Sequence, residues 1–199
     1  MKERGMIFNA EMVRAILDGR KTQTRRIMKL QPEILGSGLR YITESHEQNE
    51  VGKYFWCISD ALGMHARSAI FTCPFGAVGD HIWVRETFSA VPDYDEPAGC
   101  SALLYAADGN GPYRKWTPSI HMPRWASRLT LEITGIRVER LNSITESDAE
   151  AEGVTDTGFG DLLVDGYRYL WKSIYGEESW AANPWVWVIE FKRVEGGAA

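Results

Sequence analysis

The chain has 199 residues and a net charge of −5, with 44% hydrophobic and 25% charged residues. This composition is typical of one globular domain, and the eight Trp, eight Tyr and seven Phe exclude a wholly disordered chain. The acidic balance also argues against a high-affinity, non-specific nucleic-acid binder.

The sequence has no sign of export or membrane insertion. No apolar run approaches the roughly 18 residues that span a bilayer, and the N-terminus lacks the apolar core of a signal peptide. The three cysteines form no C-x-x-C pair, and the four histidines form no close pair. These features predict a cytoplasmic protein and motivate neither a disulfide framework nor a metal or cofactor site.

Charge is distributed unevenly along the chain. Residues 1–40 hold nine Lys or Arg and four Asp or Glu, whereas residues 141–178 hold two and nine, respectively. Two separate solvated faces would explain most of these charges. The alternative is a basic lobe that faces an acidic lobe across a cleft, where the basic lobe holds a phosphate or a nucleic acid.

The first predicted element is a short helix over about 9–18. Asn9 is a suitable N-cap, apolar residues follow at helical spacing, and Gly19 is a suitable C-cap. The next run, 20–27, has no helical apolar stripe. Its two threonines favour an extended strand or a turn that leads into one.

Insertions are predicted at about 30–78 and 89–115. The first is expected to contain a hairpin in which residues 54–58 form one strand. Between the two insertions, a turn at Gly79 and Asp80 starts a strand over 81–88.

The middle of the chain is predicted to be mostly irregular. Residues 91–100 are expected to form a loop, residues 102–106 a short strand, and residues 116–125 an irregular segment with two prolines. The longest predicted strand follows over 128–141, and Gly135 is expected to mark a bulge in it.

Two helices and a strand are predicted in the C-terminal part. Residues 143–146 match a capping box, with Ser143 or Thr145 as the N-cap of a helix over about 146–151. A longer amphipathic helix is predicted over about 161–175 and a last strand over 185–194. The apolar face of the longer helix is expected to consist of Leu163, Tyr167, Leu170, Trp171 and Ile174. Several strands interrupted by short helices favour an α+β fold, a small mixed β-barrel with short helices and long inserted loops.

Lys21 and Thr24 are the first candidates for chemistry, because four cations and two hydroxyl groups lie within residues 20–26. A threonine hydroxyl is a weak nucleophile until a base removes its proton, and a lysine serves as that base if burial lowers its pKa. In a regular strand these two side chains would point to opposite faces, so the chain must bend between them. The plainer interpretation is a basic edge strand.

Four carboxylates lie within residues 146–152. At the start of a helix they complement the macrodipole, which is sufficient to explain most of them. Glu152 differs because it lies at the helix end, where the dipole disfavours an anion. The basic N-terminal segment is its obvious partner, and a buried lysine–glutamate pair is a workable acid/base unit.

Substrate-binding candidates lie in the segment 116–128, which contains two Trp, two Arg, one His and two Pro. His121, Arg124 and Trp125 are predicted to line a pocket, because Trp and Arg faces stack on bases. An equally good interpretation is a loop whose Trp residues fill the core.

Three further residues are predicted as pocket walls. Arg26 is expected to contribute a positive charge to the pocket, and Trp83 an aromatic surface. Glu86, at the end of the strand that starts at Gly79, is added to the same pocket. Its alternative role is an ordinary ion pair with Arg85 or Arg26.

Four motifs, in this order, resemble those of the ASCH domain, a family with a PUA-like β-barrel. They are residues 19–25, the Gly79-Asp80 turn before a strand, residues 144–153, and the end of the last strand at 188–191. Residues 82–88 and 119–128 are similar to the phage- and prophage-encoded branch of the family. The resemblance covers most of the chain as a single domain over 1–199, apart from the two insertions.

The resemblance implies work on RNA or nucleosides. Small bacterial members of the family are amidohydrolases that remove the acyl group from N(4)-acetylcytidine with a lysine, a threonine and a glutamate. Residue by residue, these catalytic positions fall on Lys21, Thr24 and Glu152. This chain is longer than those enzymes, and its extra loops are placed to reshape the pocket.

The sequence therefore predicts amide hydrolysis on a modified pyrimidine nucleoside, without metal or cofactor. Thr24 attacks the acyl carbonyl, Lys21 activates it, and Glu152 positions the lysine or carries a proton to the leaving amine. Direct attack by water, with Thr24 as a hydrogen-bond donor, fits the same residues. Two other functions fit as well: a non-catalytic RNA- or modified-base-binding module, and a ribonuclease that holds the phosphate of the cleaved strand.

Overall fold

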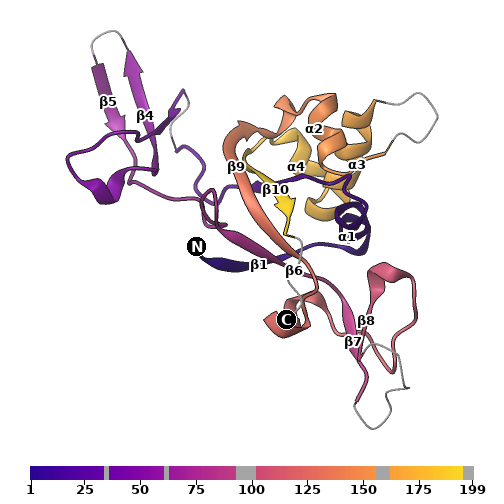
Figure 1. Ribbon diagram of the computed structural model, residues 1–199. Coiled ribbons are helices and arrows are strands. Elements are labelled where there is room, and N and C mark those ends of the chain that lie inside the picture. Colours follow the sequence, from indigo (N-terminus) through magenta and orange to yellow (C-terminus); the bar gives the residue numbers. More distant parts are fainter. Residues whose placement is uncertain (34–35, 61–62, 93–101, 156–161, 195–199) are drawn as a thin grey trace.

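The protein is an α+β structure built on one five-stranded sheet. The computed structural model describes residues 1–33, 36–60, 63–92, 102–155 and 162–194. The strand order of the sheet is β1-β6-β9-β10-β2 (Figure 1). These strands are β1 (Glu3–Ile7), β6 (His81–Arg85), β9 (Thr130–Arg140), β10 (Trp185–Arg193) and β2 (Gln23–Ile27). Strands β1 and β6 are parallel, and the other neighbours are antiparallel.

The predicted barrel is not closed by the strands that the structure describes. The sheet ends at β1 and β2, which are joined by helix α1 (Ala10–Leu17). Side chains of α1, including Val13 and Ile16, join the main core at this point. The two edges are linked by a side chain instead of a strand ladder, because Arg26 Nη2 on β2 donates to the carbonyl oxygen of Ile7 at 2.7 Å.

Helix α1 agrees with the prediction for residues 9–18. Asn9 is its N-cap and accepts a hydrogen bond from the backbone N–H of Met12 at 2.8 Å. Strand β2 agrees with the extended segment predicted to follow it. The sequence analysis missed β1, in which only Met6 is buried, because its residues show no clear alternation.

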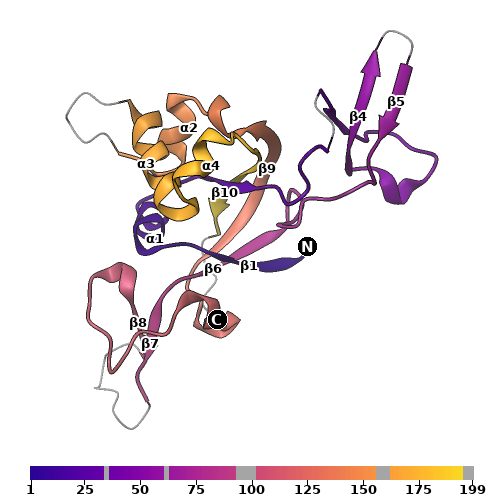
Figure 2. The ribbon, with the colours of Figure 1, turned by 180° about the vertical axis from the view of Figure 1, so that it is seen from behind.

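Three helices gather on one side of the sheet in Figures 1 and 2: α2 (Glu146–Ala151), α3 (Leu163–Tyr175) and α4 (Glu177–Ala181). They enclose a second hydrophobic cluster, which contains Tyr167 and Trp171 of α3 and Val186 and Val188 of β10. Alternate residues of β10, including Ile189, belong to the main core instead. Strand β10 is therefore buried on both faces.

The predicted residue ranges of α2 and α3 are confirmed, but the capping box of α2 and the buried face of α3 differ from the prediction. Thr145, one of the two predicted N-caps of α2, is confirmed, but its capping box is formed with Asp148 and not over 143–146 as predicted. Residues Leu141–Ser143 form a 3-10 turn, so the first residue free to cap the helix is Thr145. On α3, Ile174 is 45% exposed, although it was predicted on the buried face. The short helix α4 was not predicted.

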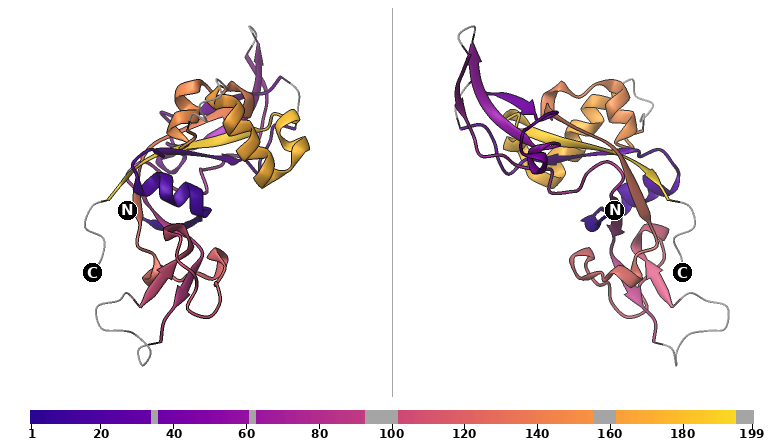
Figure 3. Two further views of the ribbon diagram at one scale, coloured as in Figure 1. Left: turned by 90° about the vertical axis from the view of Figure 1, so that its right-hand side faces the viewer. Right: turned by 60° about the vertical axis from the view of Figure 1, so that its left-hand side comes forward.

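The first insertion forms a separate three-stranded antiparallel sheet, β3-β4-β5, which projects away from the central sheet (Figures 1 and 3). Its strands are β3 (Gly38–Tyr41), β4 (Tyr54–Asp60) and β5 (Gly63–Arg67). The predicted strand at 54–58 is part of β4. Aromatic side chains anchor the insertion, because the Trp56 ring lies 5.1 Å from that of Trp185 and the Tyr54 ring 5.1 Å from that of Trp187.

The second insertion contains the hairpin β7 (Phe88–Ala90) and β8 (Leu103–Tyr105), at the other end of the molecule (Figure 1). Strand β8 agrees with the prediction at 102–106. Most of the predicted loop at 91–100 lies outside the described residues. In β9 the pairing register shifts beside Gly135, which confirms the predicted bulge. Among the described helices, none is both long enough and apolar enough to cross a membrane.

Candidate active site

The turn between α1 and β2 and the start of β2 bury both Lys21 and Thr24. The backbone N–H of Lys21 donates to the carbonyl oxygen of Ala15, and that of Thr22 donates to the carbonyl oxygen of Ala151. Lys21 therefore lies on a bend before the strand, and Thr24 lies within it. Each of these two residues is 2% exposed. Because of this bend, the strict alternation of a regular strand does not apply between the two residues, but no described contact joins their side chains.

Lys21 and Glu152 form a buried ion pair. Lys21 Nζ donates to Glu152 Oε2 at 2.7 Å and to the backbone carbonyl oxygen of Glu152 at 2.8 Å. Glu152 is the C-cap of α2, so Lys21 also satisfies a carbonyl group at the negative end of the helix dipole. The next residue must be glycine, because Gly153 has a φ of +89° and a Cβ there would lie 3.0 Å from Lys21 Cβ.

Burial lowers the pKa of the Lys21 ammonium below its ordinary value of 10.5, although the charge of Glu152 opposes this shift. The nearby Arg25 and Arg26 lower the pKa further. A neutral amine at Lys21 is therefore easier to reach than at an exposed lysine. This is the condition under which a lysine acts as a general base.

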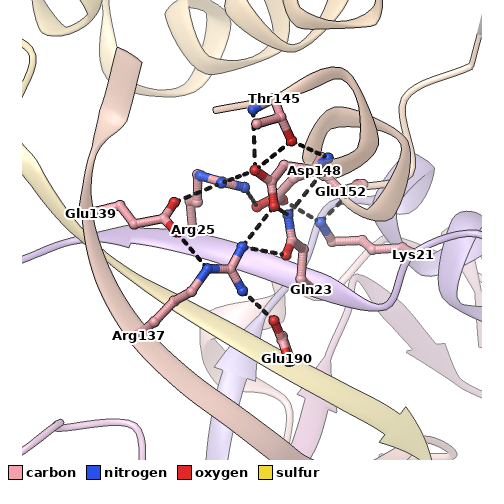
Figure 4. A network of polar contacts seen from close by, with 9 residues as sticks. All are labelled: Lys21, Gln23, Arg25, Arg137, Glu139, Thr145, Asp148, Glu152 and Glu190. Carbon is pink, nitrogen blue, oxygen red and sulfur yellow. Dashed lines mark hydrogen bonds and ion pairs between the residues drawn. The ribbon is translucent and has the colours of Figure 1, made fainter. Parts of the chain in front are cut away.

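Arg25 extends the pair into a larger network (Figure 4). Its side chain is fully buried, and Nη1 donates to Glu152 Oε1 at 3.3 Å. Nη2 of the same guanidinium lies 3.2 Å from carboxylate oxygens of both Glu139 and Asp148. One arginine therefore fixes three carboxylates that come from β9, from α2 and from the end of α2.

Arg137 on β9 forms the outer half of the network (Figure 4). It donates to Asp148 and to Glu139 at 2.6 Å each and to Glu190 on β10. Asp148 also accepts hydrogen bonds from the backbone and side chain of Thr145 and from Gln23. The basic N-terminal segment and the acidic 141–178 segment therefore meet here, through Lys21 and Arg25 on one side and Asp148 and Glu152 on the other.

Thr24 and Glu152 border the same small pocket, which is closed on one side by the aromatic residues Tyr167, Trp171 and Tyr175 of α3. The enclosed volume is about 10 Å³, enough for one water molecule. Lys21 does not line the pocket, and no hydrogen bond joins it to Thr24 in the described structure. The lysine–glutamate pair therefore reaches the pocket through the carboxylate of Glu152.

Tyr167 is the aromatic residue beside the carboxylate. Burial, followed by the negative charge of Glu152, raises its pKa well above the ordinary value of 10. The phenol therefore stays protonated in the physiological range. Its ring lies 6.1 Å from that of Trp171, and Trp171 lies 4.3 Å from Tyr175, so the three rings form one wall.

Of the predicted substrate-binding residues, only Arg26 lines this pocket. Trp83 lies on β6 with Arg85 over its ring, on the face opposite Ile82 and Val84 of the core. The other predicted residues lie in or near the 3-10 turns Ser119–His121 and Arg124–Ala126. His121 is exposed, Trp125 is 71% exposed, and Arg124 is paired with Glu3. The structure does not bring these residues to Thr24.

Glu86 is buried in an ion pair of its own. Arg128 holds both of its carboxylate oxygens at 3.0 Å and also binds Asp108. Burial raises the pKa of Glu86, while the hydrogen bonds from Arg128 oppose the shift. The partner expected for Glu86 was Arg85 or Arg26, and the structure gives Arg128 instead.

The sequence analysis missed Arg25, Asp148, Tyr167 and Trp171 as parts of the site. For Asp148 and Arg25 the only signal was the charge imbalance between two distant segments, which does not specify partners. For Tyr167 and Trp171 the helical spacing predicted burial, and it did not predict that a pocket with Thr24 and Glu152 would form there. Among the described residues, no group of three or more His, Cys, Asp or Glu is arranged to hold a metal ion.

None of the protein-family models matches the chain, and none of the curated proteins or solved structures compared with it does so either. What the site does must therefore be inferred from its own residues.

Asp148 provides a test of the network through acid stability. Burial alone would raise its pKa, but hydrogen bonds from Thr145 and Gln23 and the charge of Arg25 outweigh this and lower it from 3.8 to about 2. The unfolded chain thus protonates Asp148 before the folded one does. We expect the resulting stabilisation, about 2 kcal/mol, to be complete above roughly pH 4 and lost as the pH falls towards 2.

The measurement is urea unfolding of Asp148→Asn and the wild type at pH 7 and at pH 2.5. The variant should be less stable by about 2 kcal/mol at pH 7, and most of that difference should disappear at pH 2.5. Glu150→Gln, an exposed carboxylate of the same helix, is the matched control and should change little at either pH. A difference for Asp148→Asn that is independent of pH would contradict the role given to the carboxylate charge.

Proposed function

We propose that this protein is an amidohydrolase that removes an acyl group from the exocyclic amine of a modified cytidine or related pyrimidine nucleoside, and that its fold is of the PUA-like ASCH type. The observation that carries the proposal is the buried Lys21–Glu152 pair, with 2.7 Å between Nζ and Oε2, beside a pocket lined by Thr24. A lysine with a lowered pKa, a carboxylate and a hydroxyl together supply a base, a proton carrier and a nucleophile.

In the proposed reaction, Thr24 Oγ1 forms a bond to the acyl carbonyl carbon and its proton passes to the Lys21–Glu152 pair. The C–N bond then breaks, and the exocyclic nitrogen leaves as an amine after taking a proton from the same pair. Water hydrolyses the resulting threonyl ester and regenerates the hydroxyl. Attack by water on the amide, with Thr24 as a hydrogen-bond donor, uses the same proton carrier and leaves the same products.

The charge of the site favours a neutral substrate over a phosphodiester. Lys21, Arg25 and Arg137 are the cations of the network, and each is paired with a carboxylate. The carboxylates are four: Glu139, Asp148, Glu152 and Glu190. A phosphate would therefore meet no cation of the network that lacks a carboxylate partner, which disfavours the ribonuclease alternative. Arg26, which lines the pocket outside this network, is bound to the Ile7 carbonyl oxygen.

Substrate access requires movement of side chains, because the enclosed volume holds only one water molecule. Met12 of α1 and Leu170 and Ile174 of α3 line the pocket; the first two are partly buried and Ile174 is exposed. These are the side chains that must move to admit a planar base. Methionine is unbranched and changes rotamer readily, which suits that position.

The test is to incubate the purified protein with N(4)-acetylcytidine and to measure release of cytidine. We expect turnover by the wild type and a loss of about 10³-fold or more for Thr24→Val, which keeps the shape and removes the hydroxyl. Thr24→Ser should retain part of the activity. Thr22→Val is the matched control, because Thr22 is exposed two residues away, and it should behave as the wild type.

Other outcomes distinguish the alternatives. Full turnover by Thr24→Val would contradict the role of the hydroxyl. Binding of RNA with a steep salt dependence and no turnover would favour the binding module, and shortened RNA would favour the ribonuclease.

A further inference from the structure

Buried N–H groups without an acceptor are concentrated at the Thr24 pocket. Five buried side-chain nitrogens of the described residues have no hydrogen-bond partner: Nε of Arg25, Arg26 and Arg85, and Nε1 of Trp171 and Trp185. Three of these residues, Arg25, Arg26 and Trp171, line the pocket. Native proteins leave few buried donors unpaired, so three around one small pocket point to an occupant that accepts hydrogen bonds.

The carboxylate of Glu152 is already in use as an acceptor, whereas these donors have no acceptor. Glu152 accepts from Lys21 and Arg25. The terminal nitrogens of the arginines are also engaged, since Arg25 binds three carboxylates and Arg26 binds the Ile7 carbonyl oxygen. What remains for a ligand is N–H donors next to an aromatic wall. The matching chemistry is a planar ring that carries carbonyl oxygens or unprotonated ring nitrogens.

Trp171 is the best placed of the three donors to contact a ring. It is 2% exposed, it packs between Tyr167 and Tyr175, and its indole N–H can donate but cannot accept. The two arginines are held by their other nitrogens, so turning towards a ligand would break the ion pairs of Arg25 or the hydrogen bond from Arg26 to the Ile7 carbonyl oxygen. The Trp171 N–H has no such competing partner.

We propose that the pocket binds the acceptor edge of a pyrimidine and that Trp171 Nε1 donates a hydrogen bond to the 2-carbonyl oxygen of the base. This proposal rests on the proposed function for the class of substrate, and it adds the residue that recognises the base and the atom recognised. The 2-carbonyl is present in the acylated substrate and in the product cytidine. Trp171 is therefore a binding residue, and its loss should weaken both ligands equally.

Trp171→Phe and Trp185→Phe form a matched pair. Both remove a buried indole N–H that has no partner, but Trp185 lies at the start of β10 against Trp56 and Arg140, outside the pocket. We expect Trp171→Phe to raise the Kd for cytidine and the KM for N(4)-acetylcytidine about tenfold with kcat nearly unchanged, the effect of one hydrogen bond. Trp185→Phe should leave both constants as in the wild type. Thermal unfolding of each variant checks that the fold is retained.

2-Thiocytidine, whose sulfur is a weaker hydrogen-bond acceptor than the carbonyl oxygen it replaces, tests the atom that is recognised. The Kd of the wild type for this analogue should be about tenfold higher than its Kd for cytidine. The Trp171→Phe variant should bind the analogue no more weakly than the wild type does. In nitrogen-15 NMR spectra, the Trp171 indole resonance should shift on addition of cytidine and that of Trp185 should not.

The failures of the two proposals can be told apart. Equal Kd values for Trp171→Phe and Trp185→Phe, with turnover intact, overturn the role of Trp171 and leave the hydrolase. A fall in kcat without a change in Kd also overturns it, because the indole would then contact the reacting carbonyl. Cytidine binding that depends on Trp171 without any turnover supports the base-recognition proposal and overturns the hydrolase. If the wild type binds neither nucleoside, both proposals are overturned.

Discussion

Lys21→Met is expected to abolish hydrolysis of N(4)-acetylcytidine, with a loss of about 10³-fold or more in kcat. Methionine fills much the same space but cannot take or give a proton. General acid–base groups contribute about 10²–10⁴-fold, and here the same group also holds Glu152 in place. Release of cytidine by purified variants is the measurement, with circular dichroism to verify the fold.

Two controls separate the proton from the charge. Lys21→Arg keeps the positive charge, but arginine cannot lose its proton in the physiological range, so this variant should also be inactive. Lys192→Met removes an exposed lysine at the far end of β10 and should be fully active. Substantial activity in Lys21→Arg would show that the site needs only a cation at this position.

The elements of the fold that depend on local pattern could be predicted. Helix α1 follows from a capping asparagine and one apolar stripe, and β10 follows from a run of β-branched and aromatic residues. The predictions that failed depend on contacts between residues far apart in the sequence. Strands β1 and β2 do not pair; α1 side chains pack between them and Arg26 bridges them. This arrangement could not be predicted, because residues on opposite edges of a sheet leave no periodic pattern in the sequence.

The candidate site shows the same division. Lys21 and Glu152 are 131 positions apart, and their pairing was inferred because an anion at a helix end requires a partner. Nothing in the sequence specified Arg25, which alternates with Thr24 on β2 and would face solvent on a simple edge strand. Its burial depends on carboxylates from β9 and α2.

Apart from Arg26, the predicted pocket walls do not join the site, and for Trp83 the reason is strand geometry. Along β6, Ile82 and Val84 point into the core, so Trp83 and Arg85 must point to the other face. The turns that carry His121 and Trp125 pack beside Trp83 through Met122 and Ala126, whereas α3 packs against β10. Aromatic and cationic composition alone could not show which strands of the sheet these residues would lie beside.

Glu152→Leu is expected to have the largest effect on stability among the site variants. It leaves Lys21 buried with only a backbone carbonyl as partner and removes one of the carboxylates of Arg25. Removal of one partner of a buried ion pair costs about 3–5 kcal/mol, because the other charge remains uncompensated. Urea unfolding at pH 7 measures this loss. Glu150→Leu, on the exposed side of the same helix, should change stability much less.

The double variant Lys21→Met with Glu152→Leu separates structure from chemistry. Both buried charges are then replaced by apolar side chains of similar size, so we expect most of the lost stability to return, with a coupling energy of about 2–3 kcal/mol between the two sites. Activity should not return, because neither the base nor the proton carrier is present. A double variant that hydrolyses N(4)-acetylcytidine would show that the pair only holds the fold together. A double variant whose loss of stability equals the sum of the single losses would show that the two side chains are not coupled.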